Sequence, residues 1–118
     1  DALATVYEHE GDGDLAEATW NRAMSIVARN AGKDHPDQIY FLKSLVTMER
    51  ARGRPDAARQ YHDEALRIAL LGFGSNHPEV AEIYLDMGTM ALTDGEPKQA
   101  AQQLELALPI FEGTPETE

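Results

Sequence analysis

The sequence predicts an all-α solenoid, a stack of antiparallel helix pairs, on the strength of three observations. The dipeptide His-Pro occurs twice, at residues 35–36 and 77–78, which are 42 residues apart. Apolar side chains recur every three or four residues on both sides of Gly53, which is the spacing of one helical face. No segment alternates apolar and polar residues for long enough to indicate a strand. Together these features indicate repeated units of two helices each.

The 42-residue spacing extends well beyond the His-Pro dipeptides. Glycines, small residues and one column of larger residues recur in the same register, and chance would not align so many columns. The repeat defines one domain, residues 1–118, with units 1–34 (truncated at its start), 35–76 and 77–118. The aligned sets include Gly11, Gly53 and Gly95; Ala16, Ala58 and Ala100; Trp20, His62 and Leu104; Ala23, Ala65 and Ala107; and Thr5, Thr47 and Thr89.

Each unit is expected to hold two helices separated by a glycine turn. Gly53 and Gly95 can take the left-handed conformation that ends a helix. Pro55 and Pro97 then fall in a first helical turn, where an N–H group would have no partner in any case. Pro109 is expected to kink or stop the last helix, because proline clashes inside helices. The predicted helices are 1–10, 14–30, 36–52, 55–71, 78–93 and 97–111, with loops 31–35 and 72–77 and a polar tail, 112–118.

The net charge of −11 is distributed unevenly along the 118 residues. Residues 1–34 hold seven acids and three bases (−4), residues 35–76 hold five acids and six bases (+1), and residues 77–118 hold nine acids and one base (−8). Nucleic acids and anionic membranes are poor partners for such a chain, because binding them depends on clustered Lys and Arg. The chain has no cysteine and no apolar run long enough to span a membrane. A cytoplasmic location fits this composition.

No catalytic, cofactor or metal constellation is recognisable in the sequence. His35 and His77 are expected at equivalent edges of adjacent units, without the convergent ligands that a metal site requires, so a role as structural loop residues is favoured. His62 stands in the column of larger residues and is expected to be a partly buried packing residue. The adjacent acids at 63–64 point in different directions along a helix and cannot act as a catalytic pair. We therefore expect a protein without enzyme activity and without a cofactor.

The aligned columns resemble the tetratricopeptide repeat, with a small residue before the turn, a turn glycine, and spaced alanines in the second helix. The ordinary unit has about 34 residues. The longer unit with a His-Pro loop is similar to the repeat of kinesin light chains and related bacterial proteins. Residues 31–37 (AGKDHPD) and 74–79 (GSNHPE) carry that similarity. The resemblance covers nearly the whole chain. It implies a right-handed solenoid whose concave groove, lined by the first helix of each pair, holds a peptide of a partner protein.

Peptide recognition in this chain is expected to differ from that of kinesin light chains. They place paired asparagines where this sequence has Lys43-Ser44 and Leu85-Asp86. We predict instead a groove site with an aromatic anchor, two cations, hydroxyl groups and leucines, in which Lys43 and Arg50 receive an acidic or carboxylate-ended peptide. The predicted site residues are Tyr40, Lys43, Ser44, Thr47, Arg50, Leu85, Thr89 and Leu92.

Two alternatives stay open at this point. The basic side chains of the middle unit can equally be exposed charges that pair with acids of neighbouring units; they are Lys43, Arg50, Arg52, Arg54, Arg59 and Arg67. The chain can also be a structural or regulatory module that self-associates or packs on another domain of its parent protein. A fragment of a longer array leaves an apolar flank uncovered, and this favours homo-oligomers formed through the truncated repeat.

Overall fold

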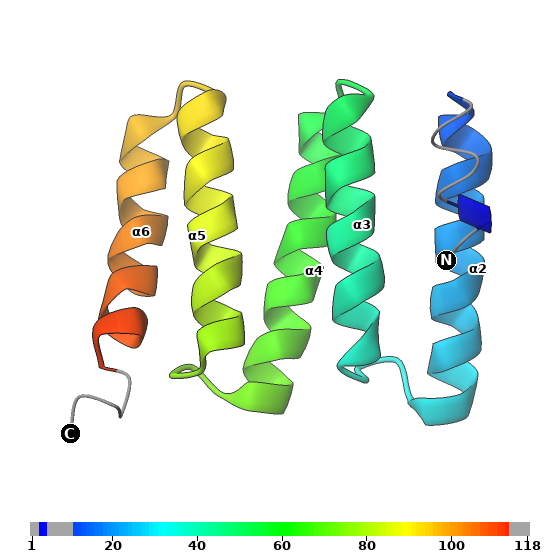
Figure 1. Cartoon of the computed structure of the whole chain (residues 1–118), viewed down its shortest axis with the longest axis horizontal. Helices are drawn as coiled ribbons and strands as arrows, with labels where there is room; N and C mark the ends of the chain where they lie inside the picture. The colour runs from blue at the N-terminus through cyan, green and yellow to red at the C-terminus, as the bar shows by residue number, and fades with distance from the viewer. Residues whose placement is uncertain (1–2, 5–10, 114–118) are drawn as a thin grey trace. The chain divides into compact units, whose positions relative to one another are not determined.

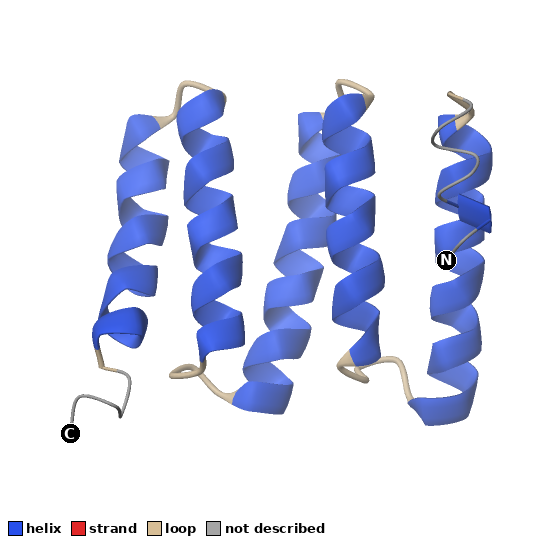
Figure 2. Cartoon of the chain, viewed as in Figure 1, coloured by secondary structure: helices blue, strands red, loops and turns tan. Residues whose placement is uncertain are grey.

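The computed structural model of the chain describes residues 3–4 and 11–113. All regular structure in these residues is helical (Figure 1, Figure 2). The helices are α2 (Gly13–Ala31), α3 (Asp37–Ala51), α4 (Pro55–Phe73), α5 (Pro78–Thr93) and α6 (Pro97–Glu112). The all-α prediction is confirmed, and each of these helices begins and ends within two residues of its predicted bounds. The predicted helix 1–10 lies outside the described residues, apart from Leu3 and Ala4.

The chain divides into two compact units, a first unit (Asp1–Ile68) and a second unit (Ala69–Glu118). The first unit contains α2, α3 and most of α4, and the second contains the end of α4 together with α5 and α6. Within each unit, successive helices run antiparallel and lie side by side (Figure 1). Antiparallel neighbours joined by short turns are the arrangement expected of helix-pair repeats.

The two glycine turns are built alike, as the repeat predicts. Gly53 and Gly95 have φ angles of 76° and 75°, in the left-handed region that glycine adopts without strain. After each glycine the chain turns back, so that the Arg54 N–H donates to the Glu49 carbonyl at 2.8 Å and the Glu96 N–H to the Ala91 carbonyl at 2.8 Å. These bonds satisfy carbonyls at the helix end, which have no partner inside the helix.

The His-Pro dipeptides cap the helices that follow them. The Nδ1 atom of His35 accepts a hydrogen bond from the Asp37 N–H at 3.0 Å, and His77 Nδ1 accepts one from the Glu79 N–H at 3.0 Å. The His77 ring also stacks on Phe73, with ring centroids 4.5 Å apart. Each histidine thus satisfies one of the N–H groups that a helix leaves unpaired at its start. The recurrence of His-Pro therefore has a structural cause.

We expect His77→Ala to lower the free energy of unfolding by about 1 kcal/mol, the usual cost of losing an N-cap acceptor. His77→Asn is the matched control, because it removes the ring stacked on Phe73 but keeps a side-chain acceptor. Urea denaturation of the two variants separates the cap from the stacking. Equal stability of the alanine and asparagine variants would show that the cap contributes nothing.

The core of the first unit lies between α2, α3 and α4. Trp20 of α2 is 2% exposed and is buried with Leu45 and Met48 of α3 and two alanines, Ala4 and Ala16. Met24, Phe41 and Tyr61 pack against this cluster. The register of α3 on α2 is fixed by buried Gln38, whose Nε2 donates to the Met24 carbonyl at 2.9 Å.

The second unit is built on close contact between α5 and α6. A side chain at Gly88 would meet the Leu104 side chain at 3.0 Å and the Ala100 carbonyl oxygen at 3.3 Å, so a small residue is required there. Of the two outcomes expected at Pro109, a kink or a stop, the stop does not occur, because α6 continues to Glu112, one residue beyond its predicted end. Proline inside a helix removes one hydrogen bond and forces a clash, but neither effect ends this helix.

Candidate functional site

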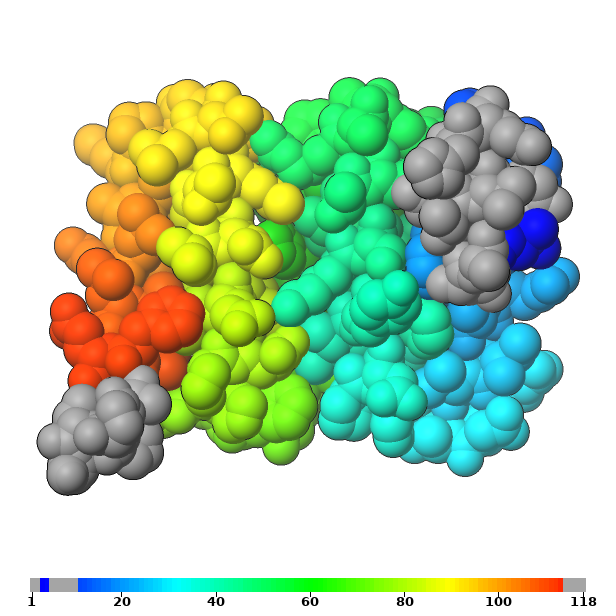
Figure 3. All heavy atoms as spheres, viewed as in Figure 1, coloured from blue at the N-terminus to red at the C-terminus, as the bar shows by residue number. Residues whose placement is uncertain are grey.

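The predicted site residues of the first unit all lie on the outward part of α3. The opposite side of this helix is buried through Leu42, Leu45, Val46, Met48 and Glu49, so the helical period turns the site residues towards solvent. Figure 3 shows side chains of α3 exposed along the helix. The ring of Tyr40 is 62% exposed and Thr47 is exposed, while Lys43, Ser44 and Arg50 are half-buried.

The hydroxyl groups on this face are already engaged as donors. Ser44 Oγ donates to the Tyr40 carbonyl at 3.1 Å, and Thr47 Oγ1 donates to the Lys43 carbonyl at 3.2 Å. A hydroxyl that gives its only hydrogen to its own helix keeps lone pairs that can accept. While its hydroxyl donates to the helix, Thr47 can therefore still accept a hydrogen bond from a backbone N–H of a bound peptide.

Tyr40 is held by aromatic neighbours although most of its ring faces solvent. Its ring meets Trp20 edge-to-face with centroids 6.0 Å apart, and it meets Phe41 at 5.6 Å. Such arrangements are favourable for aromatic pairs. A ring that is held by aromatic neighbours and still exposed to solvent is suited to bind an apolar side chain of a partner.

His62 of α4 lies close to both cations of the predicted site. It is 3% exposed, so the expectation of a partly buried residue understates its burial. Burial, opposed by the charge of Asp63 and assisted by the positive charges of Lys43 and Arg50, lowers the pKa of His62 to about 4. An imidazole taken out of water disfavours its charged form, and nearby cations add to this effect. Both cations therefore act on the same buried, neutral side chain.

The remaining predicted residues belong to α5, in the second unit. Leu85 is 40% exposed, Leu92 is 57% exposed, and Thr89 is exposed, with its hydroxyl donated to the Leu85 carbonyl at 3.0 Å. These residues occupy the columns of Lys43, Arg50 and Thr47. The α5 face thus offers leucines where α3 offers cations. A joint site of both faces stays a prediction.

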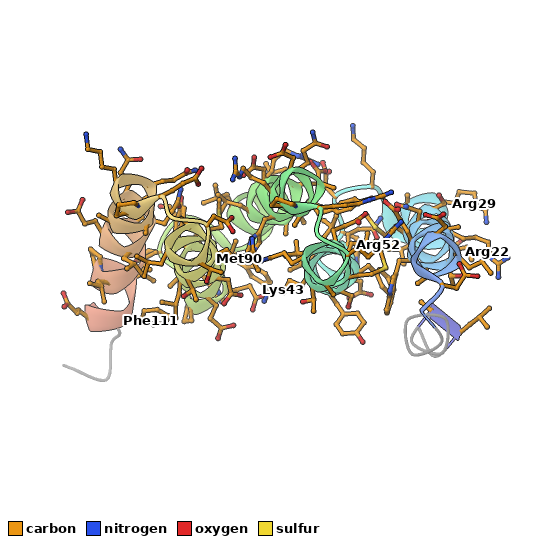
Figure 4. The ribbon with its side chains drawn as sticks, turned by 90° about the horizontal axis from the view of Figure 1, so that it is seen from above. Arg22, Arg29, Lys43, Arg52, Met90 and Phe111 are labelled. Carbon is orange, nitrogen blue, oxygen red and sulfur yellow. The ribbon has the colours of Figure 1, made fainter. Side chains whose placement is uncertain are left out.

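Other bases of the middle repeat take part in ion pairs within the first unit. Arg52 donates to the Gly13 carbonyl at 3.3 Å, to Asp14 at 2.6 Å and to Glu17 at 3.2 Å, all on α2. Arg67 pairs with Asp34 at 2.7 Å and with Glu64. Figure 4 shows Arg52 between α2 and α3 and Lys43 on the other side of α3. The alternative in which bases of the middle repeat pair with acids of a neighbouring repeat therefore holds for Arg52 and, through Asp34, for Arg67.

The cluster around Arg52 was not predicted as a unit. It also contains buried Glu49, exposed Arg54, and Tyr61 of α4, whose hydroxyl donates to Glu17 at 2.6 Å. The equivalent positions in the other repeats hold unrelated residues, for example Ala91 for Glu49. Alignment of the repeats identifies residues that recur in several repeats, so it does not reveal a cluster that occurs at one helix interface. The one available signal was the surplus of arginines in residues 35–76.

The comparison with known families decides the identity of the repeat. The profile of the tetratricopeptide repeat matches residues 1–70 and 39–113, which together span most of the chain. The chain belongs to the tetratricopeptide repeat family. Tetratricopeptide repeat domains are in general protein-interaction modules and are typically non-catalytic.

A solved structure supports the same fold for this tetratricopeptide repeat chain. The kinesin light chain-like BtubC (BKLC) from P. vanneervenii matches with a TM-score of 0.79 and 24% sequence identity over 93% of this chain. The match covers 43% of the BtubC chain. The resemblance to kinesin light chains is thus confirmed for the fold. A search of curated proteins finds no match.

The described residues contain no other recognisable site. No group of three or more His, Cys, Asp or Glu residues among them is placed to hold a metal ion. None of the helices described is long and apolar enough to cross a membrane. The α3 face and the Arg52 cluster are the two arrangements whose chemistry can be developed further.

Proposed function

We propose that this chain is a non-catalytic scaffold whose α3 face binds an acidic or carboxylate-ended segment of a partner protein. The observation that carries the proposal is that half-buried Lys43 and Arg50 lie on one helix, seven residues apart, and both act electrostatically on buried His62. An anionic ligand is attracted by both cations at once, because the two attractions add. Partial burial strengthens this attraction relative to open solvent.

The spacing of the cations defines the ligand that fits them. Lys43 and Arg50 are seven residues apart on one helix, which is a rise of about 10 Å. An extended peptide covers that distance in about three residues. Arg50 can bind a carboxylate with two parallel hydrogen bonds, while Lys43 acts as a point charge. Thr47 between them can accept a peptide N–H, and Tyr40 provides an apolar surface one turn earlier.

The net charge of the chain indicates the class of partner, and exposed residues of α5 indicate further groove positions. With a net charge of −11, nucleic acid and anionic membranes are poor partners compared with a protein or peptide. Leu85, Thr89 and Leu92 are proposed as groove residues of the second unit, where the two exposed leucines offer an apolar surface of their own. A cytoplasmic location stays a prediction that fits this role.

We expect the double charge reversal Lys43→Glu/Arg50→Glu to weaken binding of acidic peptides at least tenfold, roughly the loss of one charge-assisted contact. The matched control is Arg22→Glu/Arg29→Glu, which makes the same charge change at the same seven-residue spacing on exposed positions of α2. Figure 4 shows Arg22 and Arg29 pointing away from α3. A fluorescence anisotropy assay with Glu-rich peptides and their Gln-containing counterparts gives the affinities.

The outcome is decided by comparing the two double variants. Equal loss of binding in both would mean that only net charge matters, and the α3 site would be wrong. Unchanged binding in Lys43→Glu/Arg50→Glu would also contradict the proposal. The reversal should raise the pKa of His62, because it replaces two repelling charges by attracting ones. An NMR titration of His62 therefore verifies that the variant is folded and altered at the intended place.

Self-association is a second candidate, favoured by the apolar surface of α6. Leu106 is 50% exposed and Leu108 is 52% exposed. Leu108 aligns with Met24, which packs against the core of the first unit. Phe111, three residues after Leu108 and 38% exposed, lies on the same face as Leu108, and adjoining exposed apolar side chains are typical of interaction surfaces. Analytical ultracentrifugation that shows a concentration-dependent dimer, abolished by Leu106→Lys/Leu108→Lys, would support this alternative.

A further inference from the structure

Glu17 and Glu49 compete for the same two guanidinium groups at the α2–α3 interface. Arg52 Nη1 lies 3.2 Å from Glu17 Oε1 and 3.4 Å from Glu49 Oε1. Arg54 Nη1 lies 3.8 Å and 3.7 Å from the same two oxygens. The two carboxyl groups therefore lie close to the same two arginines, although they come from different helices.

The two carboxyl groups differ in how well they are satisfied. Glu17 accepts hydrogen bonds from the Tyr61 hydroxyl at 2.6 Å and from Arg52 at 3.2 Å. The side chain of Glu49 is 0% exposed, and neither of its oxygens has a hydrogen-bond partner. A buried carboxylate that accepts no hydrogen bond is costly. A proton on Glu49 removes this cost, because a protonated carboxyl becomes a donor.

The charges around the pair favour one proton on Glu49. Of the described residues, α2 contributes Asp14 and Glu17, α4 contributes Tyr61, and the end of α3 with its turn contributes Arg52 and Arg54. Asp14, 2.6 Å from Arg52, takes up part of that cation's charge. Burial raises the pKa of Glu49 and the Glu17 carboxylate raises it further, whereas Arg52 and Arg54 oppose the shift.

The pKa of Glu17 moves in the opposite direction. Burial disfavours its ionised form, but the hydrogen bond from Tyr61, the adjacent Glu49 carboxyl group and Arg52 hold its pKa below the ordinary value of 4.5. Two neighbouring carboxyl groups whose pKa values are pushed apart in this way share a proton over the interval between them.

We infer that Glu17 and Glu49 share one proton at pH values where an exposed glutamate is already ionised, and that this shared proton stabilises the packing of α2 on α3. We call the protonated Glu17–Glu49 pair the latch. Protonated Glu49 donates to the Glu17 carboxylate, which Tyr61 and Arg52 hold in place. When the pH rises, the proton passes to solvent and leaves two like charges between the helices. One repeat later the equivalent positions hold Arg59 and Ala91, which cannot share a proton in this way, so the release concerns α2.

The sign of the effect follows from proton linkage. The native chain binds a proton on Glu49 that the unfolded chain has already lost above about pH 4.5. Stability is therefore greatest below that value, as far as Glu49 is concerned, and falls as the pH rises through the titration of Glu49 in the folded chain. Salt bridges formed by ionised acids respond in the opposite direction, which distinguishes them from the latch.

The test uses the full chain and two measurements. Carbon-detected NMR of the glutamate carboxyl groups should place the midpoint of Glu49 above 4.5 and that of Glu17 below it. Amide hydrogen exchange, corrected for the intrinsic effect of pH, should show α2 losing protection as Glu49 ionises. Glu49→Gln keeps a donor and cannot lose a proton, so its α2 protection should stay constant over the same range.

Matched variants make the result decisive. Glu64→Gln removes an acid that is paired with Arg67 outside the cluster, and it should leave the titration of Glu49 unchanged. Glu17→Gln should move the midpoint of Glu49 to lower pH, because the repelling carboxylate is gone. The latch is overturned if wild-type Glu49 titrates at or below 4.5, a result that needs no variant to fold, or if α2 of Glu49→Gln loosens with pH as in the wild type.

Discussion

Trp20→Ala is expected to lower the free energy of unfolding by about 3–5 kcal/mol, the usual cost of removing a large aromatic side chain from a core. Trp20 is 2% exposed and is the largest of the fully buried side chains. It packs with Leu45 and Met48 from the neighbouring helix, and its ring lies 5.7 Å from that of Phe41. Urea denaturation followed by far-ultraviolet circular dichroism measures the loss, since the variant has no tryptophan left for fluorescence.

Two further variants control this result. Leu15→Ala removes a side chain from the same helix that is 47% exposed, and it should change stability by less than about 0.5 kcal/mol. Trp20→Leu introduces the residue that stands at the equivalent position 104 of the third repeat, so it should cost less than alanine. If Trp20→Ala and Leu15→Ala were equally stable, the cluster between α2 and α3 would not be the core of the first unit.

The fold was largely predictable because its determinants are periodic. A glycine at 53 and 95, a proline two residues later and alanines at fixed distances recur in the chain, and each has a local physical cause. Local causes act within a few residues, so they place helix ends well. Pro109 shows the limit of local rules, because they left a kink and a stop both open, whereas α6 continues to Glu112 while packed on α5.

The candidate site was predictable only in outline. Helical geometry was enough to put Tyr40, Lys43 and Arg50 on the outward part of α3. The ion pairs of Arg52 with Asp14 and Glu17 depend on how α2 and α3 pack against each other. Residue spacing along the chain does not give the distance between side chains on different helices. Six bases therefore formed one set in the sequence, although Lys43 and Arg50 act on His62 whereas Arg52, Arg54 and Arg67 pair with acids of the first repeat.

His62 should make the first unit sensitive to acid. The folded chain holds its pKa at about 4, whereas an unfolded chain binds the proton at about 6.5. Between these values the unfolded state binds more protons, so stability is complete above about pH 6.5 and is lost as the pH falls to about 4. The interval corresponds to about 3 kcal/mol, because each pH unit is worth about 1.4 kcal/mol.

His62→Leu isolates this contribution, since leucine stands in the same column at 104. The variant should match or exceed the wild type near neutral pH, because leucine buries no polar group, and its advantage should grow by about 3 kcal/mol on acidification to about pH 4. Hydrogen bonds from Arg67 hold the pKa values of Asp34 and Glu64 below their ordinary values, so both proteins lose that stability alike. Urea denaturation at several pH values gives the two curves. Parallel curves would mean that His62 is solvated in the folded chain, and that Lys43 and Arg50 do not converge on a buried imidazole.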